Sequence, residues 1–143
     1  MDTSCELAVG GEFRCTIPVR WGDMDALRHV NNTVYFRYFE EARVQMFEQA
    51  GIGPACGRAT IVAHTSCDFI QPIIYPATIV LTQTVKRIGR SSLEIESLME
   101  CQAKPDILYA KGRYVMVLAD SGTGRPVPWT SAELARLHAV LDH

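Results

Sequence analysis

Side chains able to move protons or bind water are concentrated between Arg20 and Tyr35. The segment reads RWGDMDALRHVNNTVY and contains Asp23, Asp25, His29 and two adjacent asparagines. In an extended segment, side chains two residues apart point to the same side, so the two aspartates would raise each other's proton affinity and one could serve as a base. Alternatively, each aspartate only accepts hydrogen bonds from the N–H groups of a turn.

A chemical and a structural interpretation are also open for His29, Asn31 and Asn32. His29 could orient a water, bind a carbonyl group or hydrogen-bond the backbone. Either asparagine is a favoured helix N-cap, because its side-chain oxygen accepts a hydrogen bond from a first-turn amide. A helix start also offers unpaired N–H groups and a positive dipole end, so a polar segment there can hold an oxyanion beside a carboxylate base.

The stretch after these residues is predicted to be a long amphipathic helix that begins at Asn31 or Asn32. Gly51 stands where a left-handed C-cap is expected. One face of this helix collects apolar side chains at the 3.6-residue spacing, namely Tyr35, Phe39, Ala42, Met46 and Ala50. The helix is therefore expected to pack on a core through this face.

Hydrophobic patterns of period two predict five strands, over residues 12–20, 61–70, 78–87, 91–101 and 108–119. Short turns make the last three an antiparallel meander, with Lys104-Pro105-Asp106 as one of the turns. A sheet with a single apolar-striped helix between its first two strands is expected to wrap around that helix. A capping box of Thr130 and Glu133 predicts a short terminal helix over 131–141. The chain, 1–143, is predicted to be one α+β domain, with residues 1–11 as a loose N-terminus.

Composition narrows the class of protein. The 143 residues carry a net charge of −2, with 48% hydrophobic and 21% charged residues, as in one compact soluble domain. The absence of any long Lys/Arg run argues against nucleic acid as a partner. No signal-peptide pattern and no apolar run of about eighteen residues occur, which argues against secretion and against a membrane span. Five cysteines without a CxxC pair predict reduced thiols in a cytoplasmic protein.

Several catalytic classes lack their motifs. The four histidines are scattered without HxxxH spacing, so no metal is expected, and no cofactor is expected because no Gly-rich nucleotide-binding motif is present. No serine lies in a nucleophile-elbow pattern, which leaves a carboxylate mechanism. Basic residues near the predicted hairpin turns could bind the phosphates of a nucleotide-bearing substrate or be solvated charges; they are Arg87, Arg90, Lys104, Lys111 and Arg113.

The run VRWGDMDALRHVNN from Val19, followed by YFRYFEEAR from Tyr35, resembles the acyl-CoA thioesterase family of the hotdog fold, in its 4-hydroxybenzoyl-CoA-thioesterase-like branch. The resemblance continues more weakly through residues 88–92 and the meander. It implies a hotdog fold, in which a curved antiparallel five-stranded sheet wraps around one long central helix, here with a short C-terminal helix. One position departs from the branch: the residue before His29 is usually glycine, and here it is Arg28.

The same resemblance implies an acyl-CoA thioesterase that releases a free acid and CoA. Asp25 would be the general base or the nucleophile, with Asp23 supporting it. The helix N-terminus at Asn32 and Thr33 would polarise the thioester carbonyl, and His29 completes the catalytic candidates. The candidates for substrate and CoA contact are Asn31, Arg87, Arg90, Ser91 and Ser92.

The family resemblance also implies an active site between two subunits, and hence a homodimer or a tetramer formed by two dimers. Two alternative functions stay open. One is a non-catalytic module that binds acyl thioesters. The other is hydration or dehydration of a hydroxyacyl thioester, for which His29 would have to face Glu40 or Glu41. The acyl group and its carrier, CoA or a carrier protein, are not predicted.

Overall fold

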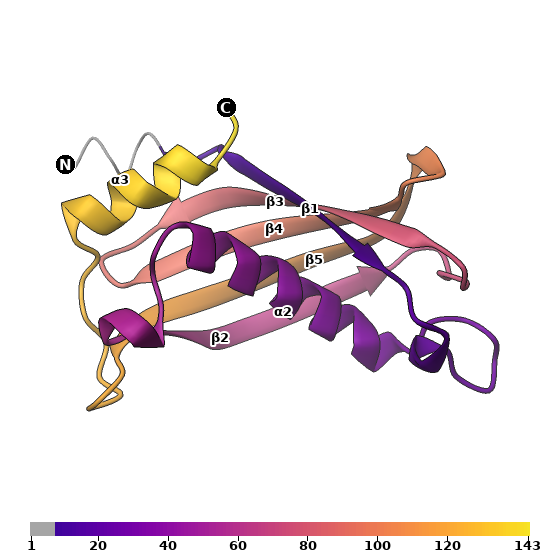
Figure 1. The fold of residues 1–143 in the computed structure, drawn as a ribbon, viewed down its shortest axis with the longest axis horizontal. Coiled ribbons are helices and arrows are strands. Elements are labelled where there is room, and N and C mark those ends of the chain that lie inside the picture. Colours follow the sequence, from indigo (N-terminus) through magenta and orange to yellow (C-terminus); the bar gives the residue numbers. More distant parts are fainter. Residues whose placement is uncertain (1–7) are drawn as a thin grey trace.

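The computed structural model describes residues 8–143, which form a five-stranded antiparallel sheet in the order β1-β3-β4-β5-β2. The sheet curves around α2 (Asn32–Gln49), and α3 (Ser131–Val140) lies near one end of it (Figure 1). The strands are β1 (Glu12–Pro18), β2 (Arg58–Phe69), β3 (Thr78–Ile88), β4 (Ser92–Cys101) and β5 (Lys104–Asp120). Two single 3-10 turns are present, η1 (Trp21–Asp23) and η2 (Pro54–Cys56). The predicted α+β architecture is confirmed.

The core lies between α2 and the concave face of the sheet. All five residues of the predicted apolar helix face are buried. Strand β4 alternates as expected, with Leu93, Ile95 and Met99 fully buried toward the helix. The helix approaches β5 closely at Gly112, where an added Cβ would lie 2.5 Å from the ring of Phe39. Gly112 is thus required by packing, since any side chain would push the helix away from the sheet.

Strand β5 begins earlier than predicted. The turn before it is formed by Gln102 and Ala103, and residues 104–106 belong to the strand. A proline is tolerated at position 105 because the ladder is irregular there: the register shifts between the Glu100–Leu108 and Cys101–Lys104 pairs, and a proline at such a bulge has no N–H to lose.

The predicted loose N-terminus is only partly described, since residues 1–7, including Cys5, lie outside the described residues. Residues 8–11 are packed rather than loose: Ala8 is fully buried, and the Gly10 N–H donates to the Val85 carbonyl at 2.8 Å. The absence of a side chain at Gly11 lets the backbone lie against the segment after α3, since a Cβ there would lie 2.8 Å from Leu141. The four described cysteines are free thiols. None of the helices within residues 8–143 has the length and apolar character needed to cross a lipid bilayer.

The two ends of the sheet are built differently. At the loop end, the segment from β1 to α2 is tied to the chain before β3, because the Val19 N–H donates to Ala77 and the Val30 N–H donates to the Ile73 carbonyl at 2.8 Å. At the α3 end, Trp129 stacks on Phe47 and its indole N–H donates to the Ser92 carbonyl. The loop end therefore contains the polar segment and the start of α2, and the α3 end contains the β3–β4 turn.

Candidate functional site

Residues 24–30 form a small hairpin that precedes α2. Met24 pairs with Val30, the Asp25 N–H donates to the His29 carbonyl at 3.0 Å, and the Arg28 N–H donates to the Asp25 carbonyl at 3.0 Å. This pattern corresponds to a three-residue hairpin loop in which a tight turn is followed by one left-handed residue. Arg28 takes that conformation, with φ of 64°. The loop geometry explains why a glycine is favoured at this position.

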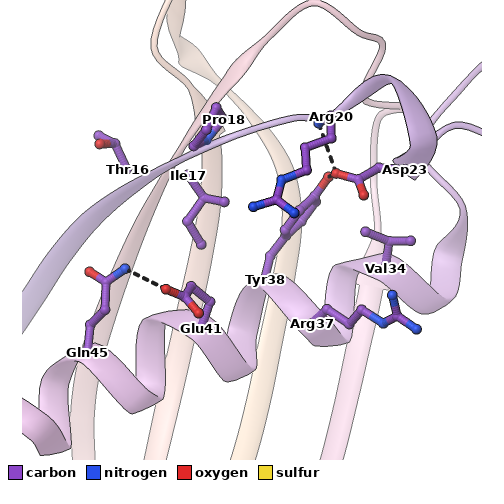
Figure 2. Close-up of a pocket in the computed structure, with 10 residues that line it drawn as sticks. All are labelled: Thr16, Ile17, Pro18, Arg20, Asp23, Val34, Arg37, Tyr38, Glu41 and Gln45. Atoms are coloured by element: carbon purple, nitrogen blue, oxygen red, sulfur yellow. Dashed lines mark hydrogen bonds between the residues drawn. The ribbon is translucent and has the colours of Figure 1, made fainter.

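Asp23 anchors the loop to the helix. Its Oδ2 accepts a hydrogen bond from the Tyr38 hydroxyl at 2.7 Å and another from the Arg20 N–H at 3.0 Å, as Figure 2 shows. Burial, and then the hydrogen bond to Asp23, raise the pKa of Tyr38 well above its ordinary value, so the hydroxyl stays a donor. The Asp23 carbonyl also accepts from the Asn31 N–H. Asp23 therefore holds β1, the loop and α2 together.

Asp25 is held more loosely. Its Oδ1 accepts from the Leu27 N–H at 2.9 Å, and its Oδ2 lies 3.4 Å from the Asn31 Nδ2. It lines a cavity of about 630 Å³ together with Arg28 and the apolar side chains of Trp21, Met24, Ile74 and Tyr75. A cavity of this volume suits a small-molecule ligand.

The two carboxylates do not form the predicted same-side pair. Asp23 is the last residue of η1 and Met24 is already extended, so the two aspartates lie on either side of the change from a 3-10 turn to extended backbone. Asp23 lines a separate cavity of about 330 Å³ between β1 and α2 (Figure 2). The structure thus gives the two aspartates different surroundings, which the Asp-x-Asp spacing did not predict.

The N-terminus of α2 is capped by Asn31, one of the two predicted caps. Its Oδ1 accepts from the Thr33 N–H at 2.9 Å and from the Thr33 hydroxyl at 2.6 Å. The Val34 N–H donates to the Asn31 carbonyl. The backbone N–H of Asn32 has no hydrogen-bond partner among residues 8–143. Because Asn31 also contacts Asp25, one side chain connects the carboxylate to the helix start.

His29 contacts the backbone rather than a glutamate. Its Nδ1 lies 3.2 Å from the Val30 carbonyl oxygen, and since a carbonyl only accepts, this hydrogen bond requires the Nδ1-protonated form. Glu40 pairs with Arg43 at 3.9 Å, and Glu41 lines the cavity that contains Asp23. The His–Glu pair that hydration chemistry needs is not formed within the described part of the chain.

Of the five residues predicted to contact substrate or CoA, Asn31 lies beside Asp25, and the other four lie at the α3 end of the same chain. Arg87, Arg90, Ser91 and Ser92 surround the β3–β4 turn, opposite the loop end (Figure 1). Two further basic candidates lie inside β5 and are paired on the sheet: Lys111 with Glu96 at 3.6 Å, and Arg113 with Glu94. One chain therefore does not bring all predicted site residues together.

Several cavity residues were not predicted. Ile74 and Tyr75 belong to the irregular segment before β3, and no periodicity links this segment to the loop at residues 20–31. Tyr38 was not assigned to the predicted apolar face of the helix, but the structure buries it there, with its hydroxyl hydrogen-bonded to Asp23. Nucleophilic thiols are not available at neutral pH in the sheet, because burial raises the pKa of Cys15 and of Cys67 to about 11.

No group of three or more His, Cys, Asp or Glu side chains that could hold a metal ion occurs in residues 8–143. The chemistry that the described residues offer is a carboxylate, an open helix amide and one guanidinium around a largely apolar cavity. Such a set can bind a carbonyl oxygen and activate a water beside it.

Comparison with known proteins gives consistent matches. The family model described as the thioesterase-like superfamily matches residues 19–137. The uncharacterized protein YsmA of Bacillus subtilis (strain 168) is 29% identical over 119 residues, which cover 82% of this chain and 79% of that protein.

Two solved structures combine similar sequence with similar fold. The PA2801 protein of Pseudomonas aeruginosa, named as a candidate thioesterase, has a TM-score of 0.80 and 36% identity, covering 84% of this chain and 93% of that one. A thioesterase of Thermus thermophilus, solved with coenzyme A and zinc, has a TM-score of 0.74 and 32% identity, covering 89% of this chain and 92% of that one.

Proposed function

Since this chain belongs to the thioesterase-like superfamily of hotdog-fold proteins, we propose that it hydrolyses an acyl-CoA thioester to a carboxylic acid and CoA. The observation that carries the proposal is the position of Asp25: its carboxylate lines the cavity of about 630 Å³ and contacts Asn31, the N-cap of α2. The contact between Asp25 and the N-cap of α2 supports a carboxylate that acts beside an oxyanion donor, as thioester hydrolysis requires.

In the proposed mechanism, the thioester carbonyl oxygen lies at the α2 N-terminus. The Asn32 N–H and the helix dipole stabilise the negative charge that develops on it, an effect worth about 3 kcal/mol for one such donor. Asp25 takes a proton from a water that adds to the carbonyl carbon. The carbon–sulfur bond then breaks, and the CoA thiolate recovers the proton. Alternatively, Asp25 attacks the carbonyl carbon itself, and water hydrolyses the resulting anhydride.

Isotope labelling identifies the nucleophilic route in which water opens the anhydride at the Asp25 carbon. In a single turnover in H2¹⁸O, the nucleophilic route puts ¹⁸O into the Asp25 carboxylate when water attacks its carbon, or into the acid when water attacks the acyl carbon. Repeated turnovers accumulate label in Asp25 only by the first of these. The general-base route always puts the label into the released acid. Mass spectrometry of the peptide that contains Asp25 after many turnovers measures whether ¹⁸O has entered its carboxylate, with Asp25→Asn as the blank.

We also propose a homodimer formed through β2. This strand is at the edge of the sheet, where Ile61 is 47% exposed and Phe69 is 43% exposed. An edge strand with apolar side chains is a ready template for pairing. Two copies paired antiparallel about a two-fold axis would put the partner's β3–β4 turn, with Arg90 and Ser91, at the loop end of this chain. The CoA contacts would then come from the partner.

A thiol-release assay over short, long and aromatic acyl-CoAs tests the activity. We expect at least one substrate to be cleaved, and Asp25→Asn to lower kcat/KM about a hundredfold or more because the positioned carboxylate is lost. Asp106→Asn, a matched change on an exposed residue of β5, should keep the wild-type rate. Binding of acyl-CoA without any hydrolysis by the wild type would instead support the non-catalytic binding module.

Subunit complementation tests the shared site. The Asp25→Asn homodimer and the Arg90→Ala homodimer should both be less active than wild type. The Arg90→Ala homodimer should be impaired through a raised KM. After unfolding and refolding as a mixture, each heterodimer contains one intact site, so about a quarter of the sites regain wild-type kinetics. Activity of the mixture equal to the average of the two variants would contradict a site shared between subunits.

A further inference from the structure

Arg28 adopts a conformation that its side chain disfavours. Among the non-glycine residues at positions 8–143 it is the one with positive φ, at 64°. A Cβ makes the left-handed region unfavourable, whereas glycine enters it without that cost. The hairpin loop needs this conformation at position 28, and its backbone hydrogen bonds do not need an arginine. The fold therefore gains nothing from the Arg28 side chain that glycine would not supply better.

The Arg28 guanidinium has no partner among residues 8–143. Some other arginines are paired, such as Arg58 with Glu133 at 2.8 Å and Arg113 with Glu94. For Arg28, no ion pair or side-chain hydrogen bond is formed with any residue from 8 to 143. The side chain is exposed and lines the cavity that contains Asp25. An unpaired fork of donors beside the reactive carboxylate is free to bind a ligand.

The negative charge of the Asp25 carboxylate in the cavity also needs a positive counterpart if an anionic substrate is to bind. Asp25 and Arg28 are the two charged residues that line it. An ionised carboxylate repels an anionic substrate, and the repulsion is stronger in a cavity with low-dielectric walls than in water. A guanidinium offsets this repulsion and can bind phosphate or carboxylate oxygens with two parallel hydrogen bonds. Among the cavity residues, Arg28 is the one able to do so.

We propose that Arg28 is a specificity-determining residue that binds an anionic oxygen of the thioester substrate, on a CoA phosphate or on a carboxylate of the acyl group. The proposal rests on the proposed thioester hydrolysis and deepens it. Arg28 thereby selects for charged thioesters at the expense of loop stability. It acts on binding of the substrate rather than on the bond-breaking step.

The test compares three replacements on four substrates. Arg28→Gln removes the charge and keeps a side chain at the left-handed position, Arg28→Gly removes the charge and relaxes the backbone, and Arg28→Lys keeps the charge without the fork. Arg37→Gln, at an arginine of α2 that lines the other cavity, is the matched control. The substrates are hexanoyl and adipoyl thioesters, each on CoA and on N-acetylcysteamine, which has no phosphate.

We expect Arg28→Gln and Arg28→Gly to raise KM by about tenfold for substrates with the recognised anion, with kcat within about twofold of wild type. Arg28→Lys should fall between, and Arg37→Gln should match wild type. An increase for both CoA thioesters and neither N-acetylcysteamine thioester identifies a CoA phosphate. An increase for both adipoyl thioesters and neither hexanoyl thioester identifies an acyl carboxylate.

Thermal unfolding separates binding from loop structure. Arg28→Gly should melt a few degrees above Arg28→Gln because its backbone is relaxed, yet have the same raised KM. A wild-type KM in Arg28→Gly, or equal KM values for wild type and Arg28→Gln on all four substrates, overturns the proposal. If the wild type cleaves none of them and none of the short, long and aromatic acyl-CoAs of the thiol-release assay, the thioesterase function is wrong; calorimetric Kd values of adipoyl-CoA for wild type and Arg28→Gln then decide the role of Arg28, and equal values overturn it.

Discussion

A carboxylate stands at each end of the sheet, and the two are treated in opposite ways. At the α3 end, Glu133 is 4% exposed, accepts two hydrogen bonds from Arg58 at 2.8 and 2.9 Å, and accepts another from the Thr130 N–H. At the loop end, Asp25 is only half-buried, with one backbone donor and a long contact to Asn31.

The difference separates a structural group from a reactive one. Burial alone would raise the pKa of Glu133, but the hydrogen bonds from Arg58 and Thr130 outweigh it and leave that pKa below 4.5. Three hydrogen bonds from the protein occupy most of its lone pairs. Asp25 keeps lone pairs available toward a cavity, where water and substrate can reach them. Incomplete satisfaction of a positioned carboxylate thus supports the loop end as the proposed site.

The largest contrast is expected in the free energy of unfolding. Glu133→Gln leaves the Arg58 charge without its carboxylate and should cost about 2 to 3 kcal/mol, while Asp25→Asn should change stability by less than about 0.5 kcal/mol. Urea unfolding measures both, with circular dichroism as the check on fold. If Asp25→Asn destabilised the protein as much as Glu133→Gln, Asp25 would be a structural group too.

Asp23 should fall between these two carboxylates. Tyr38→Phe removes one of its two donors and should cost about 1.5 kcal/mol of stability, as expected for a hydrogen bond to a charged group. A double-mutant cycle with Asp23→Asn measures the coupling between the two side chains. Additive effects of the two substitutions would mean that the hydroxyl does not anchor the loop through Asp23.

Asn31 allows the capping role and the contact with Asp25 to be separated. Asn31→Ala removes the cap and should cost about 1 kcal/mol of stability. Asn31→Ser keeps a capping oxygen but has no amide to reach Asp25, so it should keep stability within about 0.5 kcal/mol and lower kcat several-fold. Equal kcat in wild type and Asn31→Ser would show that the Asn31 amide does not position Asp25.

The smallest expected effect is the pH dependence of the stability that Glu133 contributes. Because the folded-state pKa of Glu133 is lowered, its carboxylate stabilises the fold above the unfolded pKa near 4.5, and this contribution is lost as pH falls through the folded pKa. The stability of wild type should therefore fall more steeply below that pH than the stability of Glu133→Gln. Asp106→Asn, at an exposed residue of β5, serves as the control. Parallel curves for wild type and Glu133→Gln would remove Glu133 from the acid transition.

Local patterns predicted most of the fold. Period-two strands, the apolar helix face and the Thr130 capping box were confirmed, because each is encoded within a few turns or strands of chain. The predicted start of β5 was wrong. Pro105 was interpreted as part of a turn, but a proline is equally compatible with the bulge at which it lies. The predicted loose terminus was wrong for residues 8–11, where burial depends on β3, distant in sequence.

The site was less predictable than the fold. Asp25 was singled out through resemblance, and its different environment from Asp23 follows from η1, a turn that the Asp-x-Asp spacing does not reveal. Ile74 and Tyr75 join the cavity only through tertiary pairing of the chain before β3. The roles of Asp25, His29, Asn32 and the β3–β4 turn stay predictions.

The place of β5 between β4 and the edge strand β2 affects how the protein is made. Strand β2 pairs with β5 in a register from Arg58–Asp120 to Phe69–Ala110. During synthesis, β2 and the apolar face of α2 leave the ribosome well before β5, and β2 has no strand partner until β5 is translated. Contacts this distant in sequence form slowly and leave apolar surface exposed meanwhile. The nascent chain is therefore most in need of chaperone protection between translation of α2 and of β5.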